Sequence, residues 1–140
     1  MRSKGNNELH VTSTHYDDQI ALDLVRGSQR TVAIHGCEGN ESVAYIGGSD
    51  DRLIELVTES LEDIRISVRE APHHISGTQE NNIVNMTQTQ GGVQLELTAQ
   101  LRKELFKNRK SSRKNRENKD NWDDLMYDFA DAMKKAIERA

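Results

Sequence analysis

The chain of 140 residues carries 19 Lys and Arg against 23 Asp and Glu, a net charge of -4, and 34% of its residues are hydrophobic. This length suits one domain with a core of its own. The sequence has no apolar run of transmembrane length and no leader-like start, which predicts a soluble, cytoplasmic protein. A single cysteine, Cys37, excludes an internal disulfide framework.

The basic residues gather in one segment. Residues 107–119 hold seven Lys and Arg against one acid, so this segment carries +6 and the rest of the chain carries -10. We interpret it as a linker or mobile loop to which any contact with a polyanion is confined. No aromatic side chain lies among these cations to stack on bases, which argues against nucleic acid as the partner.

The first part of the chain predicts a strand, a helix and a strand. Residues 8–13 alternate between apolar and polar side chains, as in a half-buried strand. A helix over 17–26 is expected, with Asp17 or Asp18 as its cap and Gly27 at its end. The apolar, β-branched run 31–35 predicts a buried strand. These three elements together indicate a βαβ unit.

The later elements continue this alternation. Apolar spacing and cap residues predict, in chain order, strands over 43–46, 64–68 and 92–97, and helices over 50–62, 98–107 and 121–138. Residues 71–90 read as a long loop, which in a compact domain is usually functional. The expected fold is α/β, a mostly parallel or mixed sheet flanked by helices. We divide the chain into an α/β domain (8–107), a basic linker or loop (108–120) and a C-terminal amphipathic helix packing on the domain (121–140).

Three features indicate chemistry rather than scaffold. His35 lies at the carboxyl end of a predicted strand, the edge where open α/β sheets bind ligands. Glu96 lies near the end of an otherwise apolar strand, where a carboxylate has to be paired, ligated or catalytic. A carboxylate beside a metal-bound water is a common means of making hydroxide at neutral pH. The third feature is the pair His73 and His74 in the long loop.

Five motifs in order resemble one family. They are Leu9-His10-Val11-Thr12-Ser13, Ile34-His35-Gly36-Cys37, Tyr45-Ile46-Gly47-Gly48, Gly77-Thr78 with Asn82-Ile83-Val84-Asn85, and Gly92-Val93-Gln94-Leu95-Glu96-Leu97. Together they are similar to the zinc-dependent, phage-related poly-γ-glutamate hydrolases, whose fold is like that of zinc carboxypeptidases. The resemblance covers about residues 8–107 and matches the C-terminal part of the family.

The resemblance implies hydrolysis of γ-glutamyl amide bonds in poly-γ-glutamate or a similar acidic polymer. It implies that His35 is a zinc ligand and that Glu96 activates the zinc-bound water. It also implies that Asn82 and Asn85 face the substrate, and we add His73 and His74 as candidate substrate contacts. The cofactor expected on this basis is zinc.

Two departures from the family pattern bear on activity. The family's first two zinc ligands, a His and a Glu in a glycine-rich motif, lie upstream of the motif at residues 9–13, and this chain has no such motif. Met86 stands where the family tends to have an arginine, so a substrate carboxylate loses a bidentate partner.

A catalytic zinc site needs three protein ligands and one open position. Glu38, Glu41 and His15 are candidates to complete a set with His35, although a solvated loop is the simpler interpretation of the two acids. We therefore expect impaired hydrolysis. The alternatives are a catalytically inactive relative that binds a polyanion through residues 107–119, and a cysteine hydrolase built on Cys37.

Overall fold

The computed structural model describes residues 10–140. The elements in chain order are α1 (Gln19–Arg26), β1 (Val32–Cys37), β2 (Val43–Gly48), α2 (Asp51–Asp63), β3 (Ser67–Glu70), β4 (Val93–Thr98), α3 (Ala99–Glu104), α4 (Arg113–Arg116) and α5 (Asp124–Arg139). Short 3-10 turns lie at His73–Ile75, Ile83–Asn85, Lys107–Arg109 and Lys119–Asn121. No helix in this part of the chain is long and apolar enough to cross a membrane.

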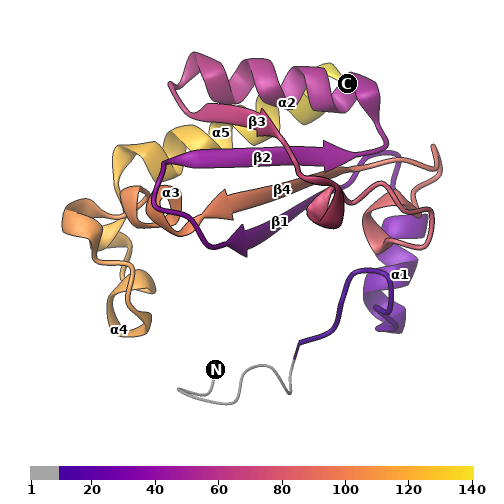
Figure 1. Cartoon of the computed structure of the whole chain (residues 1–140), viewed down its shortest axis with the longest axis horizontal. Coiled ribbons are helices and arrows are strands. Elements are labelled where there is room, and N and C mark those ends of the chain that lie inside the picture. Colours follow the sequence, from indigo (N-terminus) through magenta and orange to yellow (C-terminus); the bar gives the residue numbers. More distant parts are fainter. Residues whose placement is uncertain (1–9) are drawn as a thin grey trace.

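The sheet is mixed, with the strand order β1-β4-β2-β3. β4 pairs parallel with β1 and antiparallel with β2, while β2 pairs parallel with β3. The expected α/β sheet flanked by helices is confirmed. The parallel strands β2 and β3 are connected by the helix α2. Figure 1 shows β4 lying between β1 and β2.

The prediction of a strand over 8–13 is wrong for residues 10–13, which are the part of it that the structure describes. Residues 10–13 are not in a strand, and residues 8 and 9 lie outside the described residues. The carbonyl of Ser13 accepts from the Ile83 amide at 3.0 Å, and the His15 amide donates to the Thr12 carbonyl at 2.9 Å. The segment thus bonds to the long loop and forms a turn of its own. It does not form the regular hydrogen bonds that pair neighbouring strands. The βαβ unit expected at the start of the chain is wrong for the same reason.

One face of the sheet packs on helices and forms the core. The buried side chains Leu95 and Leu97 of β4 meet Leu53 and Val57 of α2 and Phe129 of α5 in a single cluster. Residues two apart on a strand share a face, so this face takes the apolar half of each strand. Figure 1 shows α2 and α5 together on this side of the sheet. The opposite face carries the polar half.

The helices begin where short polar side chains cap them. Asp18, Thr98 and Asp123 each accept a hydrogen bond from a backbone amide in the first turn of α1, α3 and α5. The last helix begins after Asp123 and not at the predicted residue 121, because Asp120 and Asn121 lie in a separate 3-10 turn before Trp122. Helix α3 also ends at Glu104, earlier than the predicted 107.

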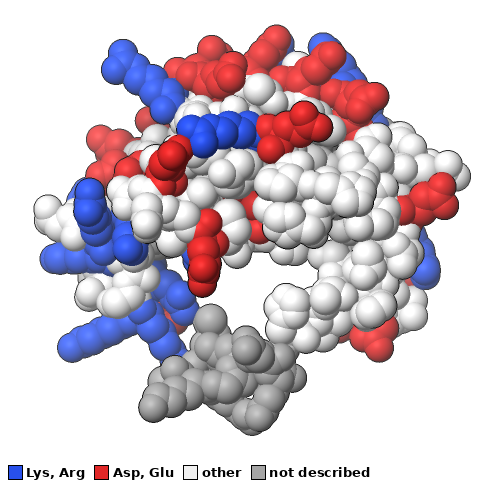
Figure 2. Space-filling model, viewed as in Figure 1, with Lys and Arg blue, Asp and Glu red and all other residues white. Residues whose placement is uncertain are grey.

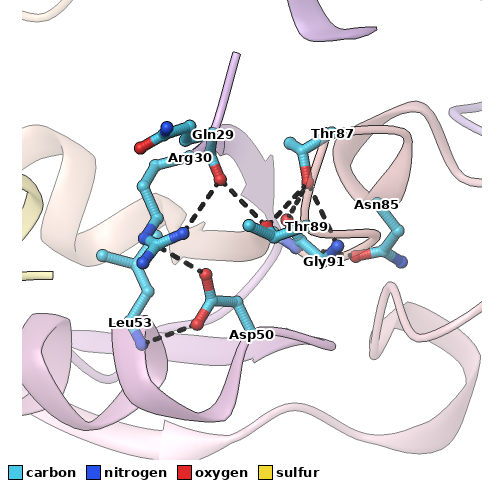
Figure 3. A network of polar contacts seen from close by, with 9 residues as sticks. Gln29, Arg30, Asp50, Leu53, Asn85, Thr87, Thr89 and Gly91 are labelled. Atoms are coloured by element: carbon cyan, nitrogen blue, oxygen red, sulfur yellow. Dashed lines mark hydrogen bonds and ion pairs between the residues drawn. The ribbon is translucent and has the colours of Figure 1, made fainter.

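A polar network fastens the start of α2 to the two segments before β1 and β4 (Figure 3). The Asp50 carboxylate accepts from the Leu53 amide at 3.0 Å and lies 3.6 Å from the Arg30 Nε. The Thr89 hydroxyl donates to the Gln29 carbonyl at 2.9 Å, and that of Thr87 donates to the Gly91 carbonyl at 2.6 Å. These bonds hold the end of the long loop against the sheet.

Replacing Asp50 by alanine is expected to lower the free energy of unfolding by about 1–2 kcal/mol. The substitution removes the cap of α2 and leaves the partly buried Arg30 without its carboxylate. Urea unfolding measures the effect. The neighbouring exposed Asp51 is the matched control, and an equal loss in Asp51→Ala would contradict the role of the cap.

The basic segment, for which we expected a linker or mobile loop, contains the short helix α4 between two 3-10 turns. Its two ends are joined by a bridge between Phe106 and Trp122 and by a bond from the Asp123 amide to the Leu105 carbonyl at 3.0 Å. The Trp122 indole donates to the Arg116 carbonyl at 2.8 Å. We call residues 107–119 the basic arm, because it is a folded projection and not an extended connection.

Candidate functional site

His35 and Glu96 lie side by side on the polar face of the sheet. In the parallel pair of β1 and β4, His35 is the register partner of Glu96. On the other side of β4, Tyr45 of β2 is the antiparallel partner of the same glutamate. Register partners point to the same face, so the central strand presents Glu96 between a histidine and a tyrosine. β1 continues for two residues beyond His35, to Cys37.

A cleft of about 610 Å³ opens over these two side chains. Its floor includes His35, Gln94 and Glu96 of the sheet. One wall is the segment 10–15, and the other comes from residues of the long loop, which include His74, Ile75 and Asn82. The loop over 71–90 thus lies beside His35 and Glu96, as expected from its length and polarity.

Glu96 is a buried carboxyl held by an amide. Its side chain is 7% exposed, and this burial raises the pKa of Glu96, while the charges of His35 and Arg102 and the bond from Gln94 oppose the rise. The Gln94 amide nitrogen lies 3.4 Å from the Glu96 Oε1 and donates to the Ile75 carbonyl at 3.1 Å. Glu96 is thereby oriented by Gln94 of its own strand, and its raised pKa makes it a better proton acceptor than an ordinary carboxylate.

The two asparagines predicted to face the substrate occupy different surroundings. Asn82 lines the cleft, and its amide donates to the Gln94 Oε1 at 3.0 Å, so it lies behind Glu96 in one chain of hydrogen bonds. Asn85 instead donates to the Gly77 and Gln79 carbonyls and accepts from Ser49 and the Gly92 amide. It lies with Met86 on a separate cavity.

The candidate metal ligands are only partly brought together. His15 and His74 line the cleft with His35, and so does His10, while His73 does not. The two candidate acids lie outside the cleft lining: Glu38 is exposed, and Glu41 forms an ion pair of 2.7 Å with Arg69. Within residues 10–140, no three His, Cys, Asp or Glu side chains are close enough to hold a metal ion. In this arrangement the described residues do not fit a zinc ion.

Cys37 is poorly suited to nucleophilic attack. Burial raises the pKa of its thiol, and the charge of Glu96 raises it further, against a smaller opposing effect from Arg102. Because the thiolate is the nucleophilic form, a raised pKa reduces reactivity at neutral pH. This environment disfavours the cysteine hydrolase alternative.

Sequence reasoning did not identify Arg102, His10 or the role of Gln94. The Arg102 guanidinium donates to the Cys37 carbonyl at 3.0 Å and lies against Gly36, where an added Cβ would meet it at 2.8 Å. Gln94 could have been recognised, because strand alternation puts it two residues before Glu96 on one face. Arg102 carried no such signal, since only the packing of α3 on β1 brings it to the strand end.

Comparison with known proteins identifies relatives of this arrangement. A family model described as poly-gamma-glutamate hydrolase matches residues 1–132. In Bacillus subtilis (strain 168), the SPbeta prophage-derived UPF0714 protein YoqZ is 34% identical over 108 residues, which cover 76% of this chain and 39% of that protein. The UPF0714 protein YmaC of the same organism is 30% identical over an alignment of 146 residues, which covers 99% of this chain and 58% of that one.

Two solved structures share the fold. A bacteriophage poly-gamma-glutamate hydrolase superposes with a TM-score of 0.91 at 31% sequence identity, covering 99% of this chain and 66% of that one. A zinc-free apo form of YndL superposes with a TM-score of 0.87 at 27% identity, covering 98% and 67%. The chain therefore spans about two thirds of each solved structure and about two to three fifths of the two curated relatives.

Proposed function

The chain belongs to the poly-gamma-glutamate hydrolase family, and from this membership we propose that its cleft acts on the γ-glutamyl amide bonds of poly-γ-glutamate. The single observation that carries the proposal is the register of Glu96 beside His35 on the floor of the cleft. A carboxyl of raised pKa at that position is a suitable general base.

In the proposed reaction, Glu96 takes a proton from a water molecule as the water oxygen bonds to the γ-carbonyl carbon. The same carboxyl then gives that proton to the amine as the C–N bond breaks. Gln94 keeps Glu96 in position, because its amide is itself fixed by the Ile75 carbonyl and by Asn82. The product ends are one new carboxylate and one amine.

Zinc is the cofactor that the family suggests, and His35 is the proposed ligand on this chain. A neutral imidazole is a normal zinc ligand, and zinc would supply Lewis-acid chemistry to hydrolysis. Because the described residues contain no group of three suitable side chains, we assign no step to zinc and propose that hydrolysis by this chain alone is impaired.

Weak zinc binding is the expected result for the isolated chain. A catalytic zinc site has three protein ligands and this chain supplies one, His35, so most of the free energy of zinc binding is missing. Elemental analysis after dialysis is expected to find well under one zinc per chain, and less still in His35→Ala. Stoichiometric zinc that disappears in His35→Ala, but remains in the control His73→Ala outside the cleft, would contradict this expectation.

The proposed function is tested by incubating the chain with poly-γ-glutamate and following polymer length by size-exclusion chromatography. Slow shortening of poly-γ-glutamate but not of poly-α-glutamate supports hydrolysis of γ-glutamyl bonds, because the two polymers share their charge and differ in linkage. An unchanged polymer, with and without added zinc, would favour the alternative of a shortened relative that only binds. That alternative is supported by the basic arm, which presents a cationic surface without needing a metal ion.

A further inference from the structure

The basic arm holds like charges together on a folded support. Figure 2 shows Lys and Arg gathered on the side of the molecule where α4 lies, while most of the opposite side of the same view is uncharged. Four cations of the arm, Lys107, Arg109, Lys110 and Lys114, form no ion pair within residues 10–140. A cluster of like charges of this kind favours an anionic ligand at this surface.

A groove of about 400 Å³ lies at the base of the arm. Its floor is apolar and comes from Leu97, Leu105, Phe106 and Met126, and its rim carries Arg102, Lys103 and Arg116. This combination suits a ligand with alternating aliphatic and carboxylate groups. A γ-glutamyl unit has that chemistry, because two methylene groups separate its γ-amide from the carbon that bears its free carboxylate.

One side chain of the groove, Arg102, is bonded to the strand that carries His35. Arg102 lines the groove, and its guanidinium donates to the carbonyl of Cys37, two residues beyond His35 on β1. Its charge also reaches Glu96, where it lowers the pKa of the carboxyl against the effect of burial. An acidic chain that leaves the cleft along this strand end therefore meets Arg102 before the arm.

We propose that the groove and the basic arm form a second binding site, which holds γ-glutamyl units of the polymer beyond the unit in the cleft. The inference rests on the proposed function for the identity of the polymer. The floor favours poly-γ-glutamate over nucleic acid, because Phe106 is set there among aliphatic side chains and residues 107–119 of the arm carry no aromatic side chain to stack on bases.

Three sets of substitutions test the site. The arm variant replaces Lys107, Arg109, Lys110 and Lys114 by alanine, and the control variant replaces four cations outside it, Arg26, Arg52, Lys134 and Lys135. The plug variant, Ser111→Phe, fills the groove without changing charge, because Ser111 lines it. If Ser111→Phe does not fold, Lys103→Glu reverses one exposed charge of the rim instead.

Binding is measured by fluorescence anisotropy with labelled oligo-γ-glutamate, oligo-α-glutamate and single-stranded DNA at about 50 and 200 mM salt. Every protein also carries Glu96→Gln, so that oligomers stay intact and a lack of hydrolysis cannot affect the result. We expect the arm variant to weaken oligo-γ-glutamate binding about tenfold, and the plug variant to weaken it without affecting DNA. The control variant should stay within about twofold.

Three outcomes would overturn the proposal. One is binding of oligo-γ-glutamate that neither the arm variant nor the groove variants weaken. The second is absence of any binding at the lower salt concentration. The third is equal binding of DNA and oligo-γ-glutamate, weakened in the arm variant and unchanged by the plug, which would make the arm a non-selective polyanion surface. In that case the salt dependence for DNA should flatten by about three in the arm variant, since each lost phosphate contact contributes roughly 0.7.

Discussion

Replacing Glu96 by glutamine is expected to reduce the cleavage of poly-γ-glutamate by about 10²–10⁴-fold, the usual contribution of a positioned acid–base group. Glutamine has nearly the same shape and keeps a carbonyl oxygen for the Gln94 amide, so the cleft should retain its geometry. It cannot accept the proton of the attacking water. Size-exclusion profiles of the digested polymer, compared with those of wild type, measure the loss.

The same substitution should make the protein more stable at neutral pH. The pKa of Glu96 in the folded chain is raised from its ordinary value of about 4.5, so the folded state binds that proton more tightly than the unfolded state. Wild-type stability therefore falls as pH rises from the ordinary to the raised pKa, and Glu96→Gln avoids this loss. The difference in Tm should vanish below the ordinary pKa.

Glu104 provides the matched control for both measurements. This residue of α3 is bonded to Ser42 and Gln100 and does not line the cleft. Glu104→Gln should leave cleavage within about twofold of wild type, in contrast to Glu96→Gln. If Glu96→Gln cleaves the polymer at the wild-type rate, Glu96 is not the base and the proposed reaction is wrong.

Replacing Gly48 by alanine is expected to lower the free energy of unfolding by about 2–6 kcal/mol, through backbone strain and overpacking together. Gly48 has φ +110°, which disfavours any Cβ, and an added Cβ would lie 2.1 Å from the Gly92 carbonyl oxygen. Gly48 also donates to the Ser76 carbonyl at 2.7 Å, so the strain would spread to the loop that walls the cleft.

Urea unfolding measures this loss, which is a large share of the stability of a small domain. Gly27→Ala is the matched control, because Gly27 ends α1 at an ordinary φ of -80° and has more room. Its effect should stay within about 1 kcal/mol. A change of the same small size in Gly48→Ala would show that the loop yields easily, and that glycine is not required there.

Local patterns in the sequence were sufficient to predict most helices and strands. Apolar spacing located α2 and α5, a β-branched run located β1, and the alternation of apolar and polar residues located β4. Asp17 or Asp18 was expected to cap α1, and Asp18 does so. Residues 8–13 show the limit of such patterns, since their alternation fits a strand but their described part bonds to a turn and a loop.

The candidate site was harder to predict, because it depends on contacts between distant segments. Strand-end position and the family resemblance led to His35 and Glu96, and the register of β1 and β4 puts them together. The partner of Glu41 is Arg69, on a strand that no local pattern aligns with the loop before β2. Likewise, composition did not show that Trp122, just after the basic arm, bonds back to the carbonyl of Arg116 within it.

The central position of β4 has a consequence for how the chain is made. β2, α2 and β3 follow one another and form a parallel pair that can assemble once residue 70 has emerged from the ribosome. β1 has no partner in the sheet until residues 93–98 are synthesised and insert between it and β2. Loop closure over such a separation is slow compared with local pairing, so β1 should stay unpaired on the ribosome for much of translation. His35 and Glu96 then meet in the same late step that completes the sheet, and a chain with a defective β4 is left with the unprotected edge of β1, from which aggregation can start.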